Sequence, residues 1–323
     1  MQNKALYVGD PHATVSNLTE MKKLINFVFD TAIENKVDFV VFLGDLFHTH
    51  AILRLEVMDF WTWVFTEAAR RGIVVVALTG NHDKPGSKEK EHISALSVFK
   101  YWKTDFVRII DEPSILYNIA FIPYYHSEEL VIEHATNCYN QGAKKCAVMH
   151  QTFTGAAYEN GFYAKDAIDP AKIPQEELIV GHIHTEQQIG KAWYPATAKW
   201  DTMGDANQNK GIWIVVHNED GSYDPLSKQF FSTENVCTPI KTFLVTEGDK
   251  LPVLKETDRN HVTLVGTSDW IKKTKKEIDG KANIKGKPTN PVTTSFLTIP
   301  SPFLVYGKHN TLSLNVVIIK ILL

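Results

Sequence analysis

Five apolar runs, each of which ends in aspartate, asparagine or histidine, constrain the fold of this chain most strongly. The runs are "ALYV", "FVVFL", "IVVVAL", "CAVM" and "LIV", and the polar residues after them are Asp10, Asp45, Asn81, His150 and His182. Residues 18–35 and 52–71, which separate some of the runs, have a helical pattern. Apolar strands that alternate with helices indicate an α/β protein, and such proteins place their sites at the carboxyl ends of strands.

Length and composition indicate a globular protein of about two domains. The chain has 323 residues and a net charge of −3, so a nucleic-acid site has to be a local patch rather than a global basic field. We expect domains at residues 1–240 and 241–323. In the second, the stretch 261–281 reads as a strand followed by a helix.

Three cysteines without a CxxC pair, Cys138, Cys146 and Cys237, predict reduced thiols and a cytoplasmic protein, in a bacterium or in a host cell. The N-terminus does not have the basic start and apolar run of a signal peptide. Because no apolar stretch approaches the ~18 residues that a membrane span needs, we expect no membrane partner.

Seven side chains at the ends of the apolar runs are candidate metal ligands: Asp10, His12, Asp45, Asn81, His150, His182 and His184. Imidazole and carboxylate suit manganese, iron and zinc, and the absence of thiolate from the set argues against a structural zinc site. Seven ligands are too many for one ion. Two ions about 3.5–4 Å apart that share a bridging carboxylate would use them all, and such a pair hydrolyses phosphate esters.

Each motif alone is weak, but the order D-x-H, G-D-x-x-H, G-N-H-D, H and G-H-x-H resembles the calcineurin-like metallophosphoesterases. Within that superfamily, "GDLFH", "GNHDKPG", "AFIPYY" and "VMHQTF" are most similar to the SbcD-like nuclease subunits that repair DNA double-strand breaks. The resemblance covers roughly residues 4–217. It implies a four-layer α-β-β-α sandwich with a small C-terminal α+β cap, which can be incomplete.

The resemblance also implies roles for individual residues. One ion would be held by Asp10, His12, Asp45 and His184, and the other by Asp45, Asn81, His150 and His182. Asp45 would bridge two divalent ions, which in this family are usually Mn²⁺. His82 would lie beside the scissile phosphate as an acid or charge stabiliser, Asp83 would orient His82, and His48 would lie near the substrate phosphate. His50 has no counterpart in the family and reads as a surface residue.

For the whole protein, the resemblance implies a DNA exonuclease or endonuclease of DNA repair or recombination. It would work with an SbcC-like coiled-coil ATPase, and could form a homodimer through residues 52–71 and 86–103. The tail after Pro291 does not resemble the helices that dock on such an ATPase. The lysines of residues 272–287 read either as a solvated helix face or as a phosphate-contacting patch, to which Lys84, Lys88 and Lys90 could add.

Two other functions remain open. One is a small-nucleotide phosphodiesterase or phosphatase, although the absence of arginine from "GDLFHTH" and "LTGNHD" argues against the protein phosphatases of the superfamily. The other is a scaffold without activity on a phosphoesterase fold, which the complete set of ligands disfavours.

Overall fold

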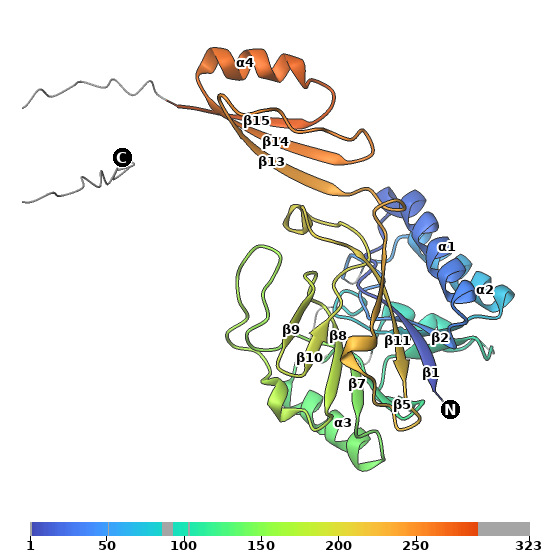
Figure 1. The fold of residues 1–323 in the computed structure, drawn as a ribbon. Coiled ribbons are helices and arrows are strands. Elements are labelled where there is room, and N and C mark those ends of the chain that lie inside the picture. Colours follow the sequence, from blue (N-terminus) through green and yellow to red (C-terminus); the bar gives the residue numbers. More distant parts are fainter. Residues whose placement is uncertain (1, 51, 86–92, 103, 290–323) are drawn as a thin grey trace, which may run out of the picture.

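Two six-stranded sheets face each other in the computed structural model, which describes residues 2–50, 52–85, 93–102 and 104–289 (Figure 1). Helices α1 (Leu18–Glu34) and α2 (Leu55–Arg71) cover the outer side of the first sheet, and α3 (Glu128–Asn140) covers the outer side of the second. The chain therefore has the predicted α-β-β-α layers.

The first sheet has the strand order β12-β11-β1-β2-β3-β4. Strands β1 to β4 are parallel, and β11 and β12 extend the sheet in antiparallel fashion beyond β1. The bounds are β1 Asn3–Val8, β2 Phe39–Phe42, β3 Val74–Leu78, β4 Val107–Ile110, β11 Gly211–His217 and β12 Gln229–Ser232.

The second sheet has the order β5-β6-β7-β8-β10-β9, with an antiparallel strand at each edge. Its bounds are β5 Ser114–Leu116, β6 Ile119–Ile122, β7 Cys146–His150, β8 Glu177–Gly181, β9 Gln187–Ile189 and β10 Ala192–Tyr194. Five short 3₁₀ helices lie in the described loops: Val15–Asn17, Ala95–Phe99, Pro170–Lys172, Met203–Asp205 and Pro225–Ser227.

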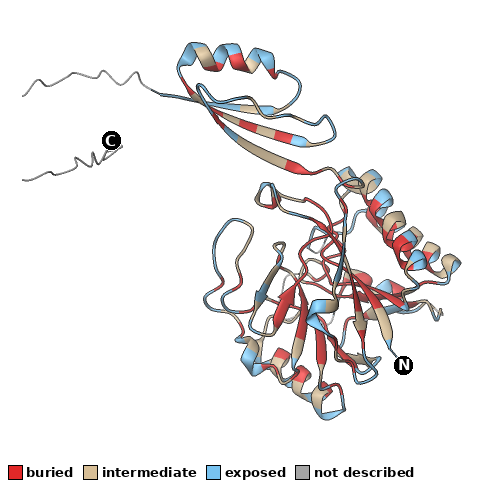
Figure 2. Ribbon diagram, in the orientation of Figure 1, coloured by how far each residue is buried: buried red, intermediate tan, exposed pale blue. Residues whose placement is uncertain are grey.

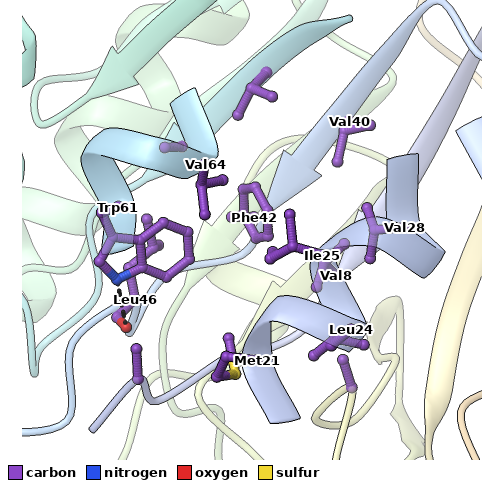
Figure 3. Close-up of a cluster of buried hydrophobic side chains, with 14 of the residues drawn as sticks. Val8, Met21, Leu24, Ile25, Val28, Val40, Phe42, Leu46, Trp61 and Val64 are labelled. Carbon is purple, nitrogen blue, oxygen red and sulfur yellow. Dashed lines mark hydrogen bonds between the residues drawn. The ribbon is translucent and has the colours of Figure 1, made fainter. Parts of the chain in front are cut away.

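The apolar runs are continuous because both faces of their strands are buried (Figure 2). In β2, Phe39 and Val41 pack between the two sheets, whereas Val40 and Phe42 pack against the helices. Figure 3 shows this outer cluster, in which the indole N–H of Trp61 donates to the Leu46 carbonyl at 3.2 Å. The buried bond fixes α2 against the loop that follows β2.

A small parallel sheet follows the sandwich, formed by β13 (Ile240–Thr246), β14 (Arg259–Gly266) and β15 (Asn283–Pro288). Helix α4 (Ser268–Glu277) connects β14 to β15 and lies on the side of this sheet that faces away from the sandwich (Figure 1). Its exposed residues include Lys272, Lys273 and Lys276, and both interpretations of this lysine-rich face remain predictions.

Three of the predictions fall partly outside the described residues. The division at residues 240 and 241 remains a prediction, because residues 290–323, including the tail after Pro291, are not described. Of the second candidate dimer segment, residues 86–92 and 103 are not described, and the described part holds a 3₁₀ helix at Ala95–Phe99. Lys88 and Lys90 also lie outside the described residues. Within the described ranges, no helix is both long enough and apolar enough to span a bilayer.

Candidate metal centre

All seven candidate ligands lie at or just after the carboxyl ends of five parallel strands. Four of them follow β1, β2 and β3 of the first sheet: Asp10, His12, Asp45 and Asn81. The other three, His150, His182 and His184, end or follow β7 and β8 of the second sheet. The candidate centre therefore lies where the two sheets meet, and each sheet supplies only part of it.

Left-handed backbone conformations turn these strand ends sharply. The φ angles are 24° at Asp10, 45° at His12, 51° at Asp45 and 87° at His182. Such angles are uncommon outside glycine and cost free energy, and they cluster at functional sites. Gly80 lets the turns approach closely, because a Cβ there would lie only 2.2 Å from Oδ1 of Asp45.

One group of donor atoms forms around His12 and His184, whose Nε2 atoms lie 3.2 Å apart. The His12 Nε2 atom is 3.8 Å from Oδ2 of Asp45. Oδ2 of Asp10 accepts a hydrogen bond from the His182 amide at 2.8 Å, while its Oδ1 is buried without a hydrogen-bond partner.

A second group forms around Asn81. Its Oδ1 atom is 2.7 Å from Nδ1 of His182 and 3.0 Å from Nε2 of His150. The Nε2 atom of His150 is also 3.3 Å from Oδ2 of Asp45, so the same Asp45 oxygen approaches both groups. The Nδ1 atom of His150 lies 2.7 Å from the Leu43 carbonyl, which accepts its proton and leaves Nε2 as the donor to a metal.

These residues fit two divalent ions. Two ligands that are each ~2.1 Å from one ion and separated by 90–110° lie about 3.0–3.4 Å apart, which is the spacing of both nitrogen pairs. His12 Nε2 is 3.2 Å from His184 Nε2, and His150 Nε2 is 3.3 Å from His182 Nδ1. The buried Oδ1 of Asp10 has an unused acceptor capacity, as expected of a ligand.

The electrostatics of the cluster also favour bound cations. Burial raises the pKa of Asp10 to about 6, and burial lowers the pKa of His12 and of His182 to about 3. Burial opposes the charge of His150, but the neighbouring Asp45 raises the pKa of that imidazole to about 9. Burial likewise opposes the charge of Asp45, yet His150 and His12 hold its pKa well below the usual range. The neutral imidazoles of His12 and His182 and the charged carboxylate of Asp45 are in the forms that bind metal, whereas His150 has to lose a proton before its Nε2 can do so.

His48 and His82 lie at the edge of the centre. Their rings are stacked, with centroids 5.7 Å apart, and each ring lies edge-on to His12. Because the His48 carbonyl can only accept, Nδ1 of His82 donates to it at 2.6 Å and Nε2 remains for other partners. Burial lowers the pKa of His82.

The carboxylate of Asp83 accepts hydrogen bonds from two backbone amides. Its Oδ1 accepts from the Phe47 amide and its Oδ2 accepts from the Gly80 amide, both at 2.9 Å. The carboxylate therefore ties the loop after β2 to the loop after β3, and its role in orienting His82 stays a prediction. Burial raises the pKa of Asp83 to about 7.

His50 also contacts the edge of the candidate centre. It is exposed, as predicted, but its ring stacks on His82 with centroids 4.3 Å apart. It therefore helps to hold the His82 ring in place.

The loop between β10 and β11 supplies site residues that the sequence did not identify. Asp201 lines the pocket, with Oδ2 3.9 Å from Nδ1 of His48. Asp205 lies behind His184, with 3.9 Å between its Oδ2 and the imidazole Nδ1. The fully buried Lys210 donates to Asp205 and to the His184 carbonyl, both at 2.6 Å. The spacing of these residues in the sequence does not reveal the contacts.

Two viral proteins are similar to this chain in sequence. "Putative phosphoesterase 244L" of Invertebrate iridescent virus 6 is 27% identical over 247 residues, which are 73% of this chain and 84% of the relative. "Putative phosphoesterase 078R" of Invertebrate iridescent virus 3 is 24% identical over 234 residues, 70% of this chain and 66% of the relative.

Among solved structures, TT1561 of Thermus thermophilus is similar with a TM-score of 0.45 at 8% identity, and the match covers 72% of this chain and 99% of that one. Residues 4–237 match the family described as "Calcineurin-like phosphoesterase". The chain therefore belongs to the calcineurin-like phosphoesterase family, and it is a metal-dependent phosphoesterase.

Proposed function

We propose that this phosphoesterase is a DNA nuclease that hydrolyses phosphodiesters with Mn²⁺. The observation that carries the proposal is the composition of the pocket over the metal centre, which has a volume of about 270 Å³. Its described lining residues are His12, Asp45, His48, His82, Tyr158, Glu159, His182, His184, Asp201 and Thr202, without lysine or arginine. A phosphomonoester dianion usually meets such cations, whereas a diester carries one charge that the metal ions can neutralise.

A carboxylate at the pocket strengthens this argument. Glu159 would repel the second charge of a terminal phosphate more than it repels a diester, whereas the charge of Asp201 is balanced by Lys199, whose Nζ lies 2.6 Å from its Oδ1. When bound, the two ions supply an activated water and neutralise the phosphate oxygens. His82 presents Nε2 as the atom that can exchange a proton with the leaving oxygen, because Nδ1 is held by the His48 carbonyl.

The proposal includes the partners that the sequence resemblance implies: DNA, an SbcC-like coiled-coil ATPase and a second copy of the chain. The place of action would be the cytoplasm. The resemblance of the motifs is the support for each of these points.

The alternative is a small-nucleotide phosphodiesterase or a phosphatase. The names of the two viral relatives give only a phosphoesterase, so they are consistent with either function. A scaffold without activity is disfavoured, because two compact groups of candidate donors, His12 with Asp45 and His82, and His150 with Asp45 and His182, share Asp45.

The experiment compares four substrates with the same protein: linear duplex DNA, single-stranded DNA, a chromogenic phosphodiester and a phosphomonoester. Each is incubated with Mn²⁺ and with a chelator, and Asp45→Asn is the control for contaminating nucleases. We expect cleavage of DNA and of the diester only with Mn²⁺. Preferential hydrolysis of the monoester would replace the nuclease with a phosphatase, and hydrolysis of the small diester without DNA would favour the small-nucleotide enzyme.

A further inference from the structure

We propose that the hairpin at residues 156–164 is an aromatic platform on which an unpaired nucleobase of the substrate strand stacks, with Phe162 as its main contact. The inference rests on the proposed nuclease function and deepens it, because it gives the kind of strand that the site accepts. The hairpin belongs to the long connection between β7 and β8, the green loop that stands beside β9 in Figure 1.

The hairpin is a defined structure within this connection. Ala157 and Tyr163 form an antiparallel bridge, and the Tyr158 amide donates to the Phe162 carbonyl at 2.8 Å. The Gly161 amide donates to the Tyr158 carbonyl at 2.9 Å, which closes a tight turn. The φ angle of 85° at Gly161 suits glycine, and Asn160-Gly161 is a typical hairpin turn sequence.

The pairing places Phe162 next to the metal pocket. Tyr158 lines that pocket, and residues opposite each other in an antiparallel pair project from the same face. Phe162, the hydrogen-bonded partner of Tyr158, therefore extends the pocket wall outward. Its side chain is 72% exposed, so the ring is available to a ligand.

Two contacts fix the hairpin against the centre. The Gln187 side chain of β9 accepts from the Ala157 amide at 2.7 Å and donates to the Ala157 carbonyl at 2.8 Å. Glu159 packs on Gly204, where a Cβ would lie 2.3 Å from Cγ of Glu159. Because Gly204 neighbours the pocket residue Thr202, the platform keeps its position relative to the metal groups.

The chemistry of this surface favours a base over a phosphate. Glu159 gives the adjacent pocket wall negative charge, which repels a phosphate but tolerates the neutral face of a base. When one phosphate of a strand lies at the metal groups, the adjoining nucleotide is within reach of the wall beside Tyr158. Bases of an intact duplex are covered by their neighbours, so only an unpaired strand or a frayed end can offer a free face.

The test measures binding rather than turnover. A short single-stranded DNA that contains 2-aminopurine is titrated with the full chain in chelator at low salt, and its fluorescence is followed. The same strand with abasic sites in place of all bases is titrated in competition. We expect 2-aminopurine fluorescence to be quenched, and Phe162→Ala to weaken binding of the base-containing strand roughly 5- to 100-fold while binding of the abasic strand is unchanged.

Three variants sharpen the result. Phe162→Trp should retain the binding, whereas Phe162→Leu should lose most of it, because leucine keeps apolar area without a stacking face. Leu226→Ala, at an apolar residue that is 93% exposed elsewhere, is the control and should bind like the wild type.

The outcomes separate this inference from the proposed function. The platform would be overturned if Phe162→Ala weakened binding of the base-containing and the abasic strand equally, or weakened neither. This holds even if the wild type cleaves DNA. Absence of quenching with the wild type would overturn it as well. Base-dependent binding without DNA cleavage would keep the platform and remove the nuclease activity.

Discussion

The Nε2 atoms of His12 and His184 lie 3.2 Å apart, although 172 positions separate the two residues in the sequence. Two neutral imidazoles at this distance either share one proton or direct their lone pairs at a common cation. Because burial lowers the pKa of His12 to about 3, this ring is neutral at physiological pH and available to a metal. The His12–His184 pair is therefore a suitable place to test whether the centre binds metal.

Asp45→Asn should remove most of the bound metal. The carboxylate approaches both donor groups, with Oδ2 3.8 Å from His12 Nε2 and 3.3 Å from His150 Nε2, and an amide neither bridges well nor neutralises two ions. Metal content of the purified protein by mass spectrometry checks this, with the exposed Asp105→Asn as the matched control. Two ions per chain in Asp45→Asn would show that Asp45 does not bridge.

His82→Gln should retain both ions and lose cleavage by about 10²- to 10⁴-fold, which is the usual contribution of a general acid or base. The reason is that His82 lines the pocket, whereas the seven candidate ligands stay in place in this variant. Metal content and kcat on the chromogenic diester are measured together, with His261→Gln in the small sheet as the control. Loss of metal would instead make His82 a ligand, since its ring nitrogen lies within reach of His12 and Asp45.

Asp205→Asn should destabilise the fold by about 3–5 kcal/mol, because it leaves the buried Lys210 with an uncompensated charge. Both side chains of this pair are fully buried, at 2.6 Å. Urea unfolding measures the loss, and Asp30→Asn is the control because the Asp30–Arg71 pair is more exposed and should cost about 1 kcal/mol or less. A similar cost for both substitutions would contradict a special role for the buried pair.

Stability should decline as the pH falls because of His217. Its Nδ1 donates to the Gly221 carbonyl at 3.1 Å, so Nε2 accepts from the Tyr7 hydroxyl at 2.8 Å, and burial lowers the pKa of this imidazole to about 4. The folded state resists protonation that the unfolded chain accepts below ~6.5. The penalty is therefore absent above a pH of about 6.5 and grows as pH falls toward the folded-state pKa.

The full penalty is of the order of 3 kcal/mol for a shift of this size. Urea unfolding of the metal-free wild type and of His217→Gln across this pH range isolates the protonation penalty of His217. Glutamine is the suitable replacement, because it can also donate to Gly221 and accept from Tyr7. We expect the difference in unfolding free energy between the two proteins to narrow as pH falls. A constant difference would mean that His217 does not titrate in this range.

The sequence predicted the strands well and placed the candidate ligands at their ends, because both features are local. An apolar run that is buried on both faces leaves a continuous pattern, and the ligands follow directly in the chain, as in "VVFLGD", which ends at Asp45. The arrangement of the layers was predicted from the family resemblance, because the local pattern of an apolar strand does not show to which sheet the strand belongs.

Contacts between loops could not be predicted in the same way. Asp83 is adjacent to His82 in sequence, yet its oxygens bind amides of Phe47 and Gly80, because the turn at residues 80–83 folds back on the preceding loop. Asp205 and Lys210 act on His184 across more than 20 positions, and nothing in their spacing indicates it. These positions depend on tertiary structure and not on pattern.

The division of the ligands between the two sheets has a consequence for the order of events in synthesis. A nascent chain that ends before residue 145 can form β1 to β4 and carries Asp10, His12, Asp45 and Asn81, but it lacks His150, His182 and His184. Domains tend to fold from the N-terminus as the ribosome proceeds. The first half must then hold its left-handed turns by itself, and the candidate metal centre is complete only after His184 has left the exit tunnel.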